Sequence, residues 1–432
     1  RNKAVNDTYE PGSTYKIITL ATALEEGTVN LNSTFDCTGS LKVDGWTLRC
    51  SKRAGHGHQT LTEAVGNSCN PAFMNIAFSV GEETYYKYMG DFGLFEKTGV
   101  DLQGEETGVR IKESDFKRID LASYSFGQNF TVTPLALIAA QAACVNGGYL
   151  YTPYVVEKEL DGDGNVVYQH DATPVRQVVS EETSATVRQI LEYVVTDGTG
   201  KNGQVAGYRI GGKTGTADKA NTKTPENPKG DIVVSFLAFA PADDPQIMML
   251  LTLDTPARDT GTYPSGGNMV APTASAILAD ILPYLGIAPQ YTDEDAAAVE
   301  ATVPYVVGLS EAEAAAKLKE YGFTAYRTVG NGDMVTDQTP LGGAIIPVGA
   351  EVILYMGAEK SNEPCTVPNV MGLTAAQDNK KLVDAGLIMK ATGASGDNKG
   401  VKVIGQSMAE GTQVAAGTVI TIQMGQTSAT AD

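Results

Sequence analysis

The pattern of apolar and polar positions divides the chain into a mixed helix-and-strand part and a repeated part. Apolar residues recur at helical spacing in residues 13–26, 131–146 and 183–196, which predicts three helices. Three strand-like runs joined by short turns follow, GYRIGGKTGTA, DIVVSFLAFAP and QIMMLLTLDTP, and a last helix is expected from Val270 to Leu285. Helices, then adjacent strands, then a closing helix predict an α+β layer with an antiparallel sheet.

The last third of the chain contains one unit twice. One copy opens VPYVVGLSEAEAAAKLKEYGF and the other opens VPNVMGLTAAQDNKKLVDAGL. Each has a capping box ahead of a short helix, Ser310 to Glu313 and Thr374 to Gln377, and each closes on alternating strand residues. Two copies are too few for a solenoid, so the pattern predicts two small α+β domains.

Two shifts in composition mark linkers. Residues 287–302 are acidic and rich in Ala without an apolar period, and residues 358–366 form a shorter linker. The expected organisation is a first domain, two repeats and a tail, at residues 1–286, 303–357, 367–425 and 426–432. Because there is no initiator Met and no leader-like segment at Arg1, we expect a piece of a longer protein whose first domain lacks its N-terminal part.

Composition and charge exclude several classes of protein. Of the 432 residues, 42% are hydrophobic and 19% are charged, which is typical of a globular chain. The net charge of −19 argues against nucleic acid or an anionic membrane surface as the main partner. No apolar run approaches the roughly 18–20 residues of a membrane-spanning helix.

Cysteine and histidine are sparse. The chain has Cys37, Cys50, Cys69, Cys144 and Cys365, and its histidines are His56, His58 and His170. There is no CxxC pair, so we expect no metal site of the usual zinc spacing. Only one of the three histidines lies outside a single short loop, so a Ser-His-Asp triad is not expected either. Cys37 and Cys50 flank a turn segment. They could form a disulfide or remain as two free thiols, and the sequence fits both alternatives equally well.

Ser13 and Lys16 form an S-x-x-K motif at the start of the first predicted helix. Positions three apart share a helix face, so the Lys16 amine can lie beside the Ser13 hydroxyl. A serine needs an adjacent base to attack an acyl carbon, and a partly buried lysine with a lowered pKa can be that base. Most such matches are a helix cap followed by a surface lysine, so the motif alone decides nothing.

A second motif, Ser68-Cys69-Asn70, stands directly before Pro71, which suits the first turn of a helix. A loop serine and asparagine can serve as a proton relay and an amide donor in a cleft. Ordinary N-cap chemistry is the simpler explanation of this motif by itself.

The third motif, Lys213-Thr214-Gly215-Thr216, lies on the first of the three predicted strands. Glycine within a strand often marks the close approach of a ligand backbone. A cation and two hydroxyls beside that gap suit an extended peptide that ends in a carboxylate. A polar edge strand explains this motif equally well when it is taken singly.

Together the three motifs are far more specific. S-x-x-K, S-x-N and K-T-G in this order are typical of penicillin-binding proteins and class A β-lactamases. The segments EPGSTYK, NSCNPAF, FGQNFTVTPLALIAA, CVNGG and GGKTGTA resemble the transpeptidase domain of a class B penicillin-binding protein across residues 1–286. The two repeats resemble PASTA domains along their whole length. One departure is Asn129, which stands where many relatives have glycine.

The resemblance implies a fold and residue roles. The fold is the α+β penicillin-binding transpeptidase or serine β-lactamase-like fold, an antiparallel sheet with helices, followed by two small α+β PASTA domains. The implied catalytic residues are the nucleophile, its base and a proton shuttle to the leaving amine, Ser13, Lys16 and Ser68. The implied substrate-binding residues are Asn70, Lys213, Thr214, Gly215 and Thr216. Backbone N–H groups of Ser13 and Thr216 would form the oxyanion hole.

The resemblance also implies a function. It is that of a peptidoglycan D,D-transpeptidase that cross-links stem peptides ending in D-Ala-D-Ala, without a cofactor, and is acylated by β-lactams. The expected setting is the extracytoplasmic face of the membrane, anchored by an N-terminal helix outside this chain, with division or sporulation wall-synthesis partners such as a glycosyltransferase. The alternatives are a β-lactam hydrolase on the same fold and a catalytically silent receptor for muropeptides or β-lactams.

One sequence feature favours a transpeptidase over a hydrolase. Class A β-lactamases release the acyl group with a glutamate that has an asparagine four positions later, between the second and third motifs. Between Pro71 and Gly212 no glutamate of this chain has that neighbour. We therefore expect an acyl-enzyme that water releases slowly.

Overall fold

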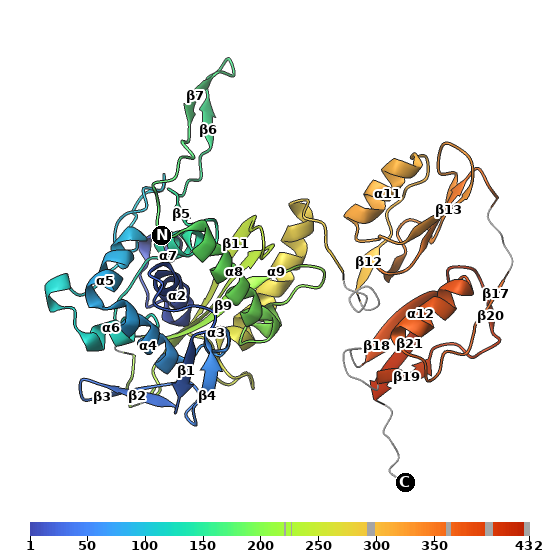
Figure 1. Cartoon of the computed structure of the whole chain (residues 1–432). Helices are drawn as coiled ribbons and strands as arrows, with labels where there is room; N and C mark the ends of the chain where they lie inside the picture. The colour runs from blue at the N-terminus through green and yellow to red at the C-terminus, as the bar shows by residue number, and fades with distance from the viewer. Residues whose placement is uncertain (220–221, 226, 292–298, 360–363, 394–400, 427–432) are drawn as a thin grey trace, which may run out of the picture. The chain divides into compact units, whose positions relative to one another are not determined.

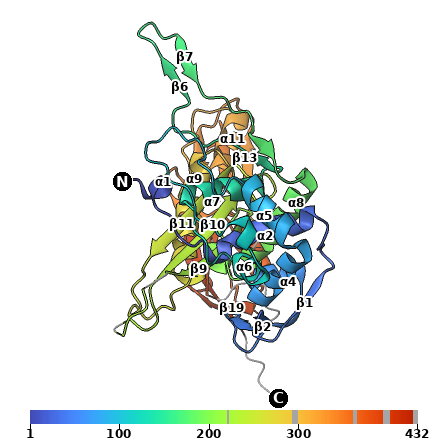
Figure 2. The ribbon, with the colours of Figure 1, turned by 90° about the vertical axis from the view of Figure 1, so that its left-hand side faces the viewer.

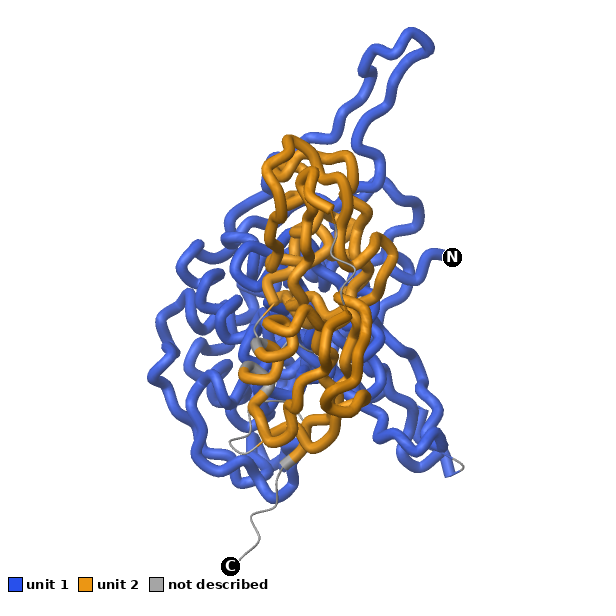
Figure 3. The backbone as a smooth tube through the Cα atoms, turned by 90° about the vertical axis from the view of Figure 1, so that its right-hand side faces the viewer, with its two compact units in different colours: residues 1–205, 209–278 blue, residues 206–208, 279–432 orange. Residues whose placement is uncertain are grey.

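The structure is a computed structural model that describes residues 1–219, 222–225, 227–291, 299–359, 364–393 and 401–426 (Figure 1). The chain forms two compact units, which Figure 3 distinguishes by colour. Unit 1 comprises residues 1–205 and 209–278, and unit 2 comprises residues 206–208 and 279–432. None of the described helices is long and apolar enough to cross a bilayer.

Unit 1 is built from helices around a central antiparallel sheet. Its α-helices are α1 (Lys3–Asn6), α2 (Lys16–Glu25), α3 (Leu61–Gly66), α4 (Asn70–Val80), α5 (Glu82–Asp91), α6 (Arg118–Tyr124), α7 (Pro134–Ala143) and α8 (Glu181–Thr196). Shorter turns are η1 (Gly12–Tyr15), η2 (Glu113–Asp115), η3 (Lys201–Gly203) and η4 (Gly266–Val270), and α9 (Ala271–Tyr284) passes from unit 1 into unit 2.

The central sheet has the order β11-β10-β9, with β9 (Gly211–Asp218), β10 (Ile232–Ala240) and β11 (Ile247–Asp254) all antiparallel. Every residue of β10 is buried, because it lies between the other two strands. Leu237 and Phe239 of β10 join the main apolar core, to which α2, α4, α7 and α8 also contribute. Among the described residues β11 pairs only with β10, so its outer side is an edge.

A group of short strands lies beside α3 and α4 (Figures 1 and 2). It consists of β1 (Thr34–Cys37) paired with β4 (Gly57–Thr60), and of β2 (Ser40–Val43) paired with β3 (Trp46–Arg49). Elsewhere β5 (Tyr149–Leu150) pairs with β8 (Arg176–Gln177), while β6 (Lys158–Leu160) and β7 (Val166–Gln169) form a hairpin that projects from unit 1 (Figure 2).

Unit 2 contains the two repeats, and the described residues of each include one helix and an apolar core. The core of the first repeat also takes in Ile388 of the second. The first repeat has β12 (Glu300–Thr302), α11 (Glu311–Glu320), β13 (Tyr326–Gly330), β14 (Asp337–Thr339), β15 (Ile345–Pro347) and β16 (Val352–Met356). The second has β17 (Cys365–Thr366), α12 (Ala375–Asp384), β18 (Ile388–Gly393), β19 (Val401–Gln406), β20 (Gln413–Val414) and β21 (Val419–Gln426). Both predicted capping boxes are formed, at Ser310 and at Thr374.

The predicted architecture is confirmed: helices and an antiparallel sheet, followed by two small α+β domains. The expected helices correspond to η1 with α2, to α7, to α8 and to α9. Asn129 has a φ of +68°, a left-handed conformation that glycine adopts freely and asparagine tolerates better than most residues. That conformation explains why asparagine can replace glycine at this position.

The disulfide alternative for Cys37 and Cys50 is not realised. Both residues are buried free thiols in the structure. The Cys50 Sγ lies instead 3.6 Å from Nδ1 of His56, because the loop after β3 folds back beside it.

Candidate active site

Ser13 lies in η1, immediately ahead of α2, and Lys16 is the first residue of α2. Gly12 precedes Ser13 with a φ of +57°, and a Cβ there would be 2.7 Å from the Thr216 carbonyl oxygen of β9. Glycine therefore allows the strand backbone to approach the turn that carries Ser13. The Ser13 side chain is half-buried, and its hydroxyl forms no hydrogen bond with any residue that the structure describes.

Lys16 is fully buried and reaches the second motif. Its Nζ donates to the Ser68 carbonyl oxygen at 2.8 Å, to Ser68 Oγ at 3.1 Å and to Asn70 Oδ1 at 2.7 Å. Asn70 Nδ2 donates in turn to the Arg49 carbonyl oxygen at 3.0 Å, which orients the amide with its oxygen toward the lysine. The Phe73 ring lies 5.1 Å from the Lys16 Nζ and adds a cation–π contact.

Ser68 connects α3 to α4 in an uncommon backbone conformation. Its φ of +51° is left-handed, which is unusual for a residue with a side chain. Pro71 follows in the first turn of α4, as the sequence predicted. This tight connection places Ser68 Oγ between the first and third motifs.

The third motif lies on β9 and reaches the same hydroxyl. Lys213 Nζ donates to Ser68 Oγ at 2.9 Å and to the Thr214 carbonyl oxygen at 3.1 Å. A Cβ on Gly215 would lie 2.3 Å from Ser235 Oγ and 2.9 Å from Thr14 Cγ2, so only glycine lets β9 pack this closely beside the turn that carries Ser13.

The two threonines of this motif differ in exposure. Thr216 is exposed, whereas Thr214 is buried and its hydroxyl lies 2.9 Å from that of Thr199. Thr199 follows α8 in a loop that no motif identified. Thr216 is therefore the hydroxyl of this motif that an incoming ligand can reach directly.

Burial changes the acid–base properties of both lysines. Desolvation lowers the pKa of Lys16 to about 7, and it lowers the pKa of Lys213 well below its ordinary value, with repulsion from Lys16 as a further cause. Removing a charged amine from water favours its neutral form, and two neighbouring positive charges disfavour each other. The neutral form of Lys16 has two N–H groups, so it gives up one of the three hydrogen bonds described above and offers a lone pair that can accept a proton.

A cleft of about 750 Å³ lies at the outer end of β9. Thr216 and Asp218 of β9 line it together with three cationic side chains, Arg53, Lys229 and Arg258. These cations suit an anionic group beside Thr216, although the chain as a whole is acidic. No motif identified them, because they come from three separate loops.

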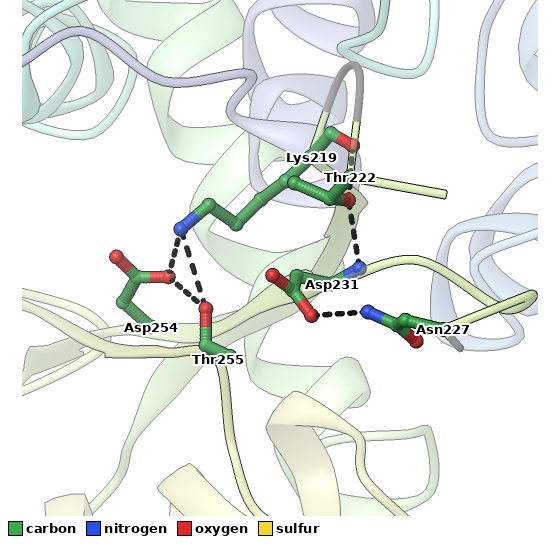
Figure 4. A network of polar contacts seen from close by, with 6 residues as sticks. All are labelled: Lys219, Thr222, Asn227, Asp231, Asp254 and Thr255. Atoms are coloured by element: carbon green, nitrogen blue, oxygen red, sulfur yellow. Dashed lines mark hydrogen bonds and ion pairs between the residues drawn. The ribbon is translucent and has the colours of Figure 1, made fainter. Parts of the chain in front are cut away.

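Polar contacts tie the far ends of the three strands together near this cleft (Figure 4). Lys219 Nζ contacts Asp254 Oδ1 at 2.7 Å and Thr255 Oγ1 at 3.2 Å. The Asp231 amide donates to Thr222 Oγ1 at 2.8 Å, across the β9–β10 connection. The network joins the end of β9 to the end of β11 and stabilises this rim of the cleft.

Comparison with known proteins agrees with this geometry. The chain matches the penicillin binding protein transpeptidase domain over residues 1–279 and the PASTA domain over residues 301–358 and 366–426. It is 42% identical over 372 residues to stage V sporulation protein D of Bacillus subtilis, covering 84% of this chain and 56% of that protein. It is 30% identical over 294 residues to peptidoglycan D,D-transpeptidase FtsI of Escherichia coli K12, covering 67% of this chain and 46% of that protein.

Solved structures show the same likeness. Penicillin-binding protein 3 of Mycobacterium tuberculosis, complexed with ampicillin, aligns with a TM-score of 0.61 and 29% identity, covering 68% of this chain and 65% of that one. The transpeptidase domain of Burkholderia pseudomallei penicillin-binding protein 3 aligns with a TM-score of 0.59 and 29% identity, covering 68% of this chain and 84% of that one. The chain spans about half the length of the curated relatives described above. It belongs to the penicillin-binding protein transpeptidase family, in the class B group that carries C-terminal PASTA domains.

Proposed function

We propose that this chain carries the catalytic centre of a peptidoglycan D,D-transpeptidase, with Ser13 as the residue that becomes acylated. The observation that carries the proposal is the convergence of two buried lysines, Lys16 and Lys213, on the hydroxyl of Ser68 beside the S-x-x-K serine. The E. coli relative is named a peptidoglycan D,D-transpeptidase, which supports this choice of reaction.

In the first step neutral Lys16 accepts the Ser13 proton while Ser13 Oγ attacks the carbonyl carbon between the two terminal D-Ala residues. The new Oγ–C bond forms as the carbonyl becomes an oxyanion, which the backbone N–H groups of Ser13 and Thr216 would stabilise. The Ser13 hydroxyl has no hydrogen bond to a described residue, so it is free to turn toward the substrate or the amine.

In the second step the C–N bond breaks and the terminal D-Ala leaves as an amine. That nitrogen needs a proton, which Ser68 is suited to deliver. Ser68 would in exchange take up the proton that Lys16 accepted from Ser13, because Lys16 Nζ already donates a hydrogen bond to the Ser68 oxygen. A neighbouring stem-peptide amine then attacks the acyl-enzyme, and its proton returns along the same path.

Substrate binding divides between the two sides of the site. Asn70 would hold the stem-peptide amide, while Thr216 would bind its terminal carboxylate and Thr214 would support the strand. Lys213 is fully buried and would support the proton network at Ser68. The cationic cleft at the end of β9 extends this surface toward acidic parts of the peptide. Stem peptides lie outside the cytoplasmic membrane, so we place the reaction on that face, on a protein anchored by a helix outside this chain and working with a wall-synthesis glycosyltransferase.

The experiment is turnover of a D-Ala-D-Ala thioester mimic with a D-amino acid as the acceptor amine. Turnover that disappears in Ser13→Ala and persists in Ser79→Ala, a serine of α4 that bonds to Thr28, supports the proposal. Penicillin binding without thioester turnover would indicate a silent receptor. Repeated hydrolysis of penicillin would indicate a β-lactam hydrolase.

A further inference from the structure

Three cysteines and one histidine meet in a pocket beside the second motif. The Sγ atoms of Cys37, Cys50 and Cys69 and a ring nitrogen of His56 all lie within 4.8 Å of one another. They come from four places: the end of β1, the loop after β3, the residue before β4 and the N-cap of α4. The spacing is C-x12-C-x5-H-x12-C, without a CxxC pair, and for that reason the sequence led us to expect no metal site.

The distances fit the ligands of a single tetrahedral metal ion. Zinc binds thiolate at about 2.3 Å and imidazole at about 2.0–2.1 Å, so two tetrahedral ligands lie about 3.5 Å apart for S and N and about 3.8 Å apart for S and S. The Cys50 Sγ and His56 Nδ1 are 3.6 Å apart. The other pairs lie within 4.8 Å, so the four atoms need a contraction of at most about 1 Å to enclose a zinc ion.

The three cysteines of this cluster are buried, and among the described residues no carboxylate belongs to the cluster. Cys37, Cys50 and Cys69 are 2%, 1% and 0% exposed, and all are free thiols, while His56 is half-buried. The apolar neighbours of the thiols are Ala64, Ala72 and Phe35. Sulfur and imidazole in a small apolar pocket are the ligands that zinc prefers over magnesium or calcium.

The backbone around the pocket is shaped to bring these ligands together. Gly39 and Gly55 have φ values of +93° and +83°. A Cβ on Gly39 would lie 2.0 Å from the Arg53 carbonyl oxygen, and one on Gly55 would lie 2.2 Å from that of Cys37. The loop after β3 can press against the end of β1 only because both positions are glycine.

We propose that Cys37, Cys50, His56 and Cys69 bind one Zn²⁺ ion through three thiolates and His56 Nδ1. Binding displaces the thiol protons to solvent and forms four metal–ligand bonds, with no change of oxidation state. Four protein ligands leave no open coordination position, so this zinc is structural and takes no part in bond-breaking.

The site has a consequence for the reaction, and that consequence rests on the proposed function. Cys69 stands between Ser68 and Asn70, and the Arg49 carbonyl that accepts the Asn70 amide is next to Cys50. One zinc ion would thus hold both backbone segments that position the Ser68 hydroxyl and the Asn70 amide. The ligands are positioning residues, because none of them is proposed to touch substrate.

The test begins with metal content. The full chain is purified under reducing conditions without chelators, and inductively coupled plasma mass spectrometry should find about one zinc ion per chain. Replacement of zinc by Co²⁺ should give the thiolate charge-transfer band and the visible bands of tetrahedral cobalt. Removing zinc with a strong chelator should lower the melting temperature, and adding Zn²⁺ alone should restore it.

Matched variants locate the site. His56→Ala and Cys37→Ser should lose most of the zinc, whereas His58→Ala, an exposed histidine two positions on, and Cys365→Ser in the second repeat should keep it. If a ligand variant fails to fold, the cobalt spectrum and the chelator titration of the unaltered chain still decide the matter. Loss of zinc in His58→Ala equal to that in His56→Ala would overturn the assignment.

Two other results would also overturn the proposal. One is a folded chain that binds no zinc after incubation with Zn²⁺ under reducing conditions. The other is a disulfide between two of the three pocket cysteines that persists in the folded chain under those reducing conditions. A chain that holds zinc but is not acylated by penicillin supports the metal site and contradicts the proposed function, so the two failures are distinguishable.

Discussion

Lys213 donates a hydrogen bond from Nζ to Oγ of Ser68 at 2.9 Å, although 145 positions separate them in the chain. Lys16 donates to the same oxygen at 3.1 Å. A serine oxygen has two lone pairs, and these two contacts use both of them. The Ser68 proton is then directed away from the lysines and is available to a departing amine.

Ser68→Ala removes this shared acceptor. We expect penicillin acylation to slow by roughly 10²-fold, within the range that positioned proton transfer contributes. The second-order rate of labelling by a fluorescent penicillin measures the effect, with Ser79→Ala on α4 as the matched control. A change of less than about threefold in a folded Ser68→Ala protein would contradict the relay.

The pH dependence of acylation should report Lys16. Its folded pKa is about 7 rather than 10.5, because burial disfavours the ammonium form. In the proposed mechanism the neutral amine is the base, so the acylation rate should fall about tenfold per pH unit below 7 and level off above it. Rates of fluorescent penicillin labelling between pH 5.5 and 8.5 test this, with circular dichroism to verify folding. A rate that is flat across this range would exclude Lys16 as the base.

Gly215→Ala tests the close packing of β9 against the turn that carries Ser13. The added Cβ would lie 2.3 Å from Ser235 Oγ and 2.9 Å from Thr14 Cγ2. We expect a loss of about 1–3 kcal/mol in the free energy of unfolding, typical of overpacking, together with slower acylation. Denaturant unfolding measures the first effect. Gly162→Ala is the control, since a Cβ at that glycine meets nothing within 4 Å and should change neither quantity.

The repeats should be dispensable for acylation. The described residues of the two apolar cores of the repeats all lie beyond residue 300, and no residue of the three motifs lies beyond residue 286. A chain ending at Thr302 should therefore label with penicillin at nearly the rate of the full chain. Loss of labelling in a shortened chain that still melts cooperatively would show that the repeats contribute to the site.

Motif order in the sequence was enough to predict which residues gather in the site. Ser13, Ser68 and Lys213 are far apart in the chain, yet each stands in a short pattern whose combination is specific. Spacing alone did not predict the contacts of Lys16. Three positions on a helix place it beside Ser13, but its hydrogen bonds go to Ser68 and Asn70. These residues stand in the α3–α4 connection and at the start of α4, which tertiary packing brings to Lys16.

The cysteine pocket illustrates the opposite case. Its four members are separated by twelve, five and twelve residues, so no local pattern connects them. They meet because β1 pairs with β4 in a register that sets Cys37 opposite Gly57, next to His56. Such a register depends on the folded sheet, and the sequence alone left a disulfide between Cys37 and Cys50 as an open alternative.

The lifetime of the acyl-enzyme separates a transpeptidase from a hydrolase. Among the described residues no carboxylate hydrogen-bonds to Ser13, Lys16 or Ser68, and the Glu–Asn pattern of class A β-lactamases is absent between the second and third motifs. Loss of a general base costs about 10²–10⁴-fold in rate. Water should therefore release a penicilloyl group slowly.

The most direct measurement is the mass of the peptide that penicillin modifies in the folded chain. We expect one penicilloyl group per chain, on the peptide that contains Ser13, persisting after free penicillin is removed and absent from Ser13→Ala. A group attached to any other residue, or rapid catalytic hydrolysis of penicillin without a trapped adduct, would contradict the assignment of Ser13 as the nucleophile of a transpeptidase.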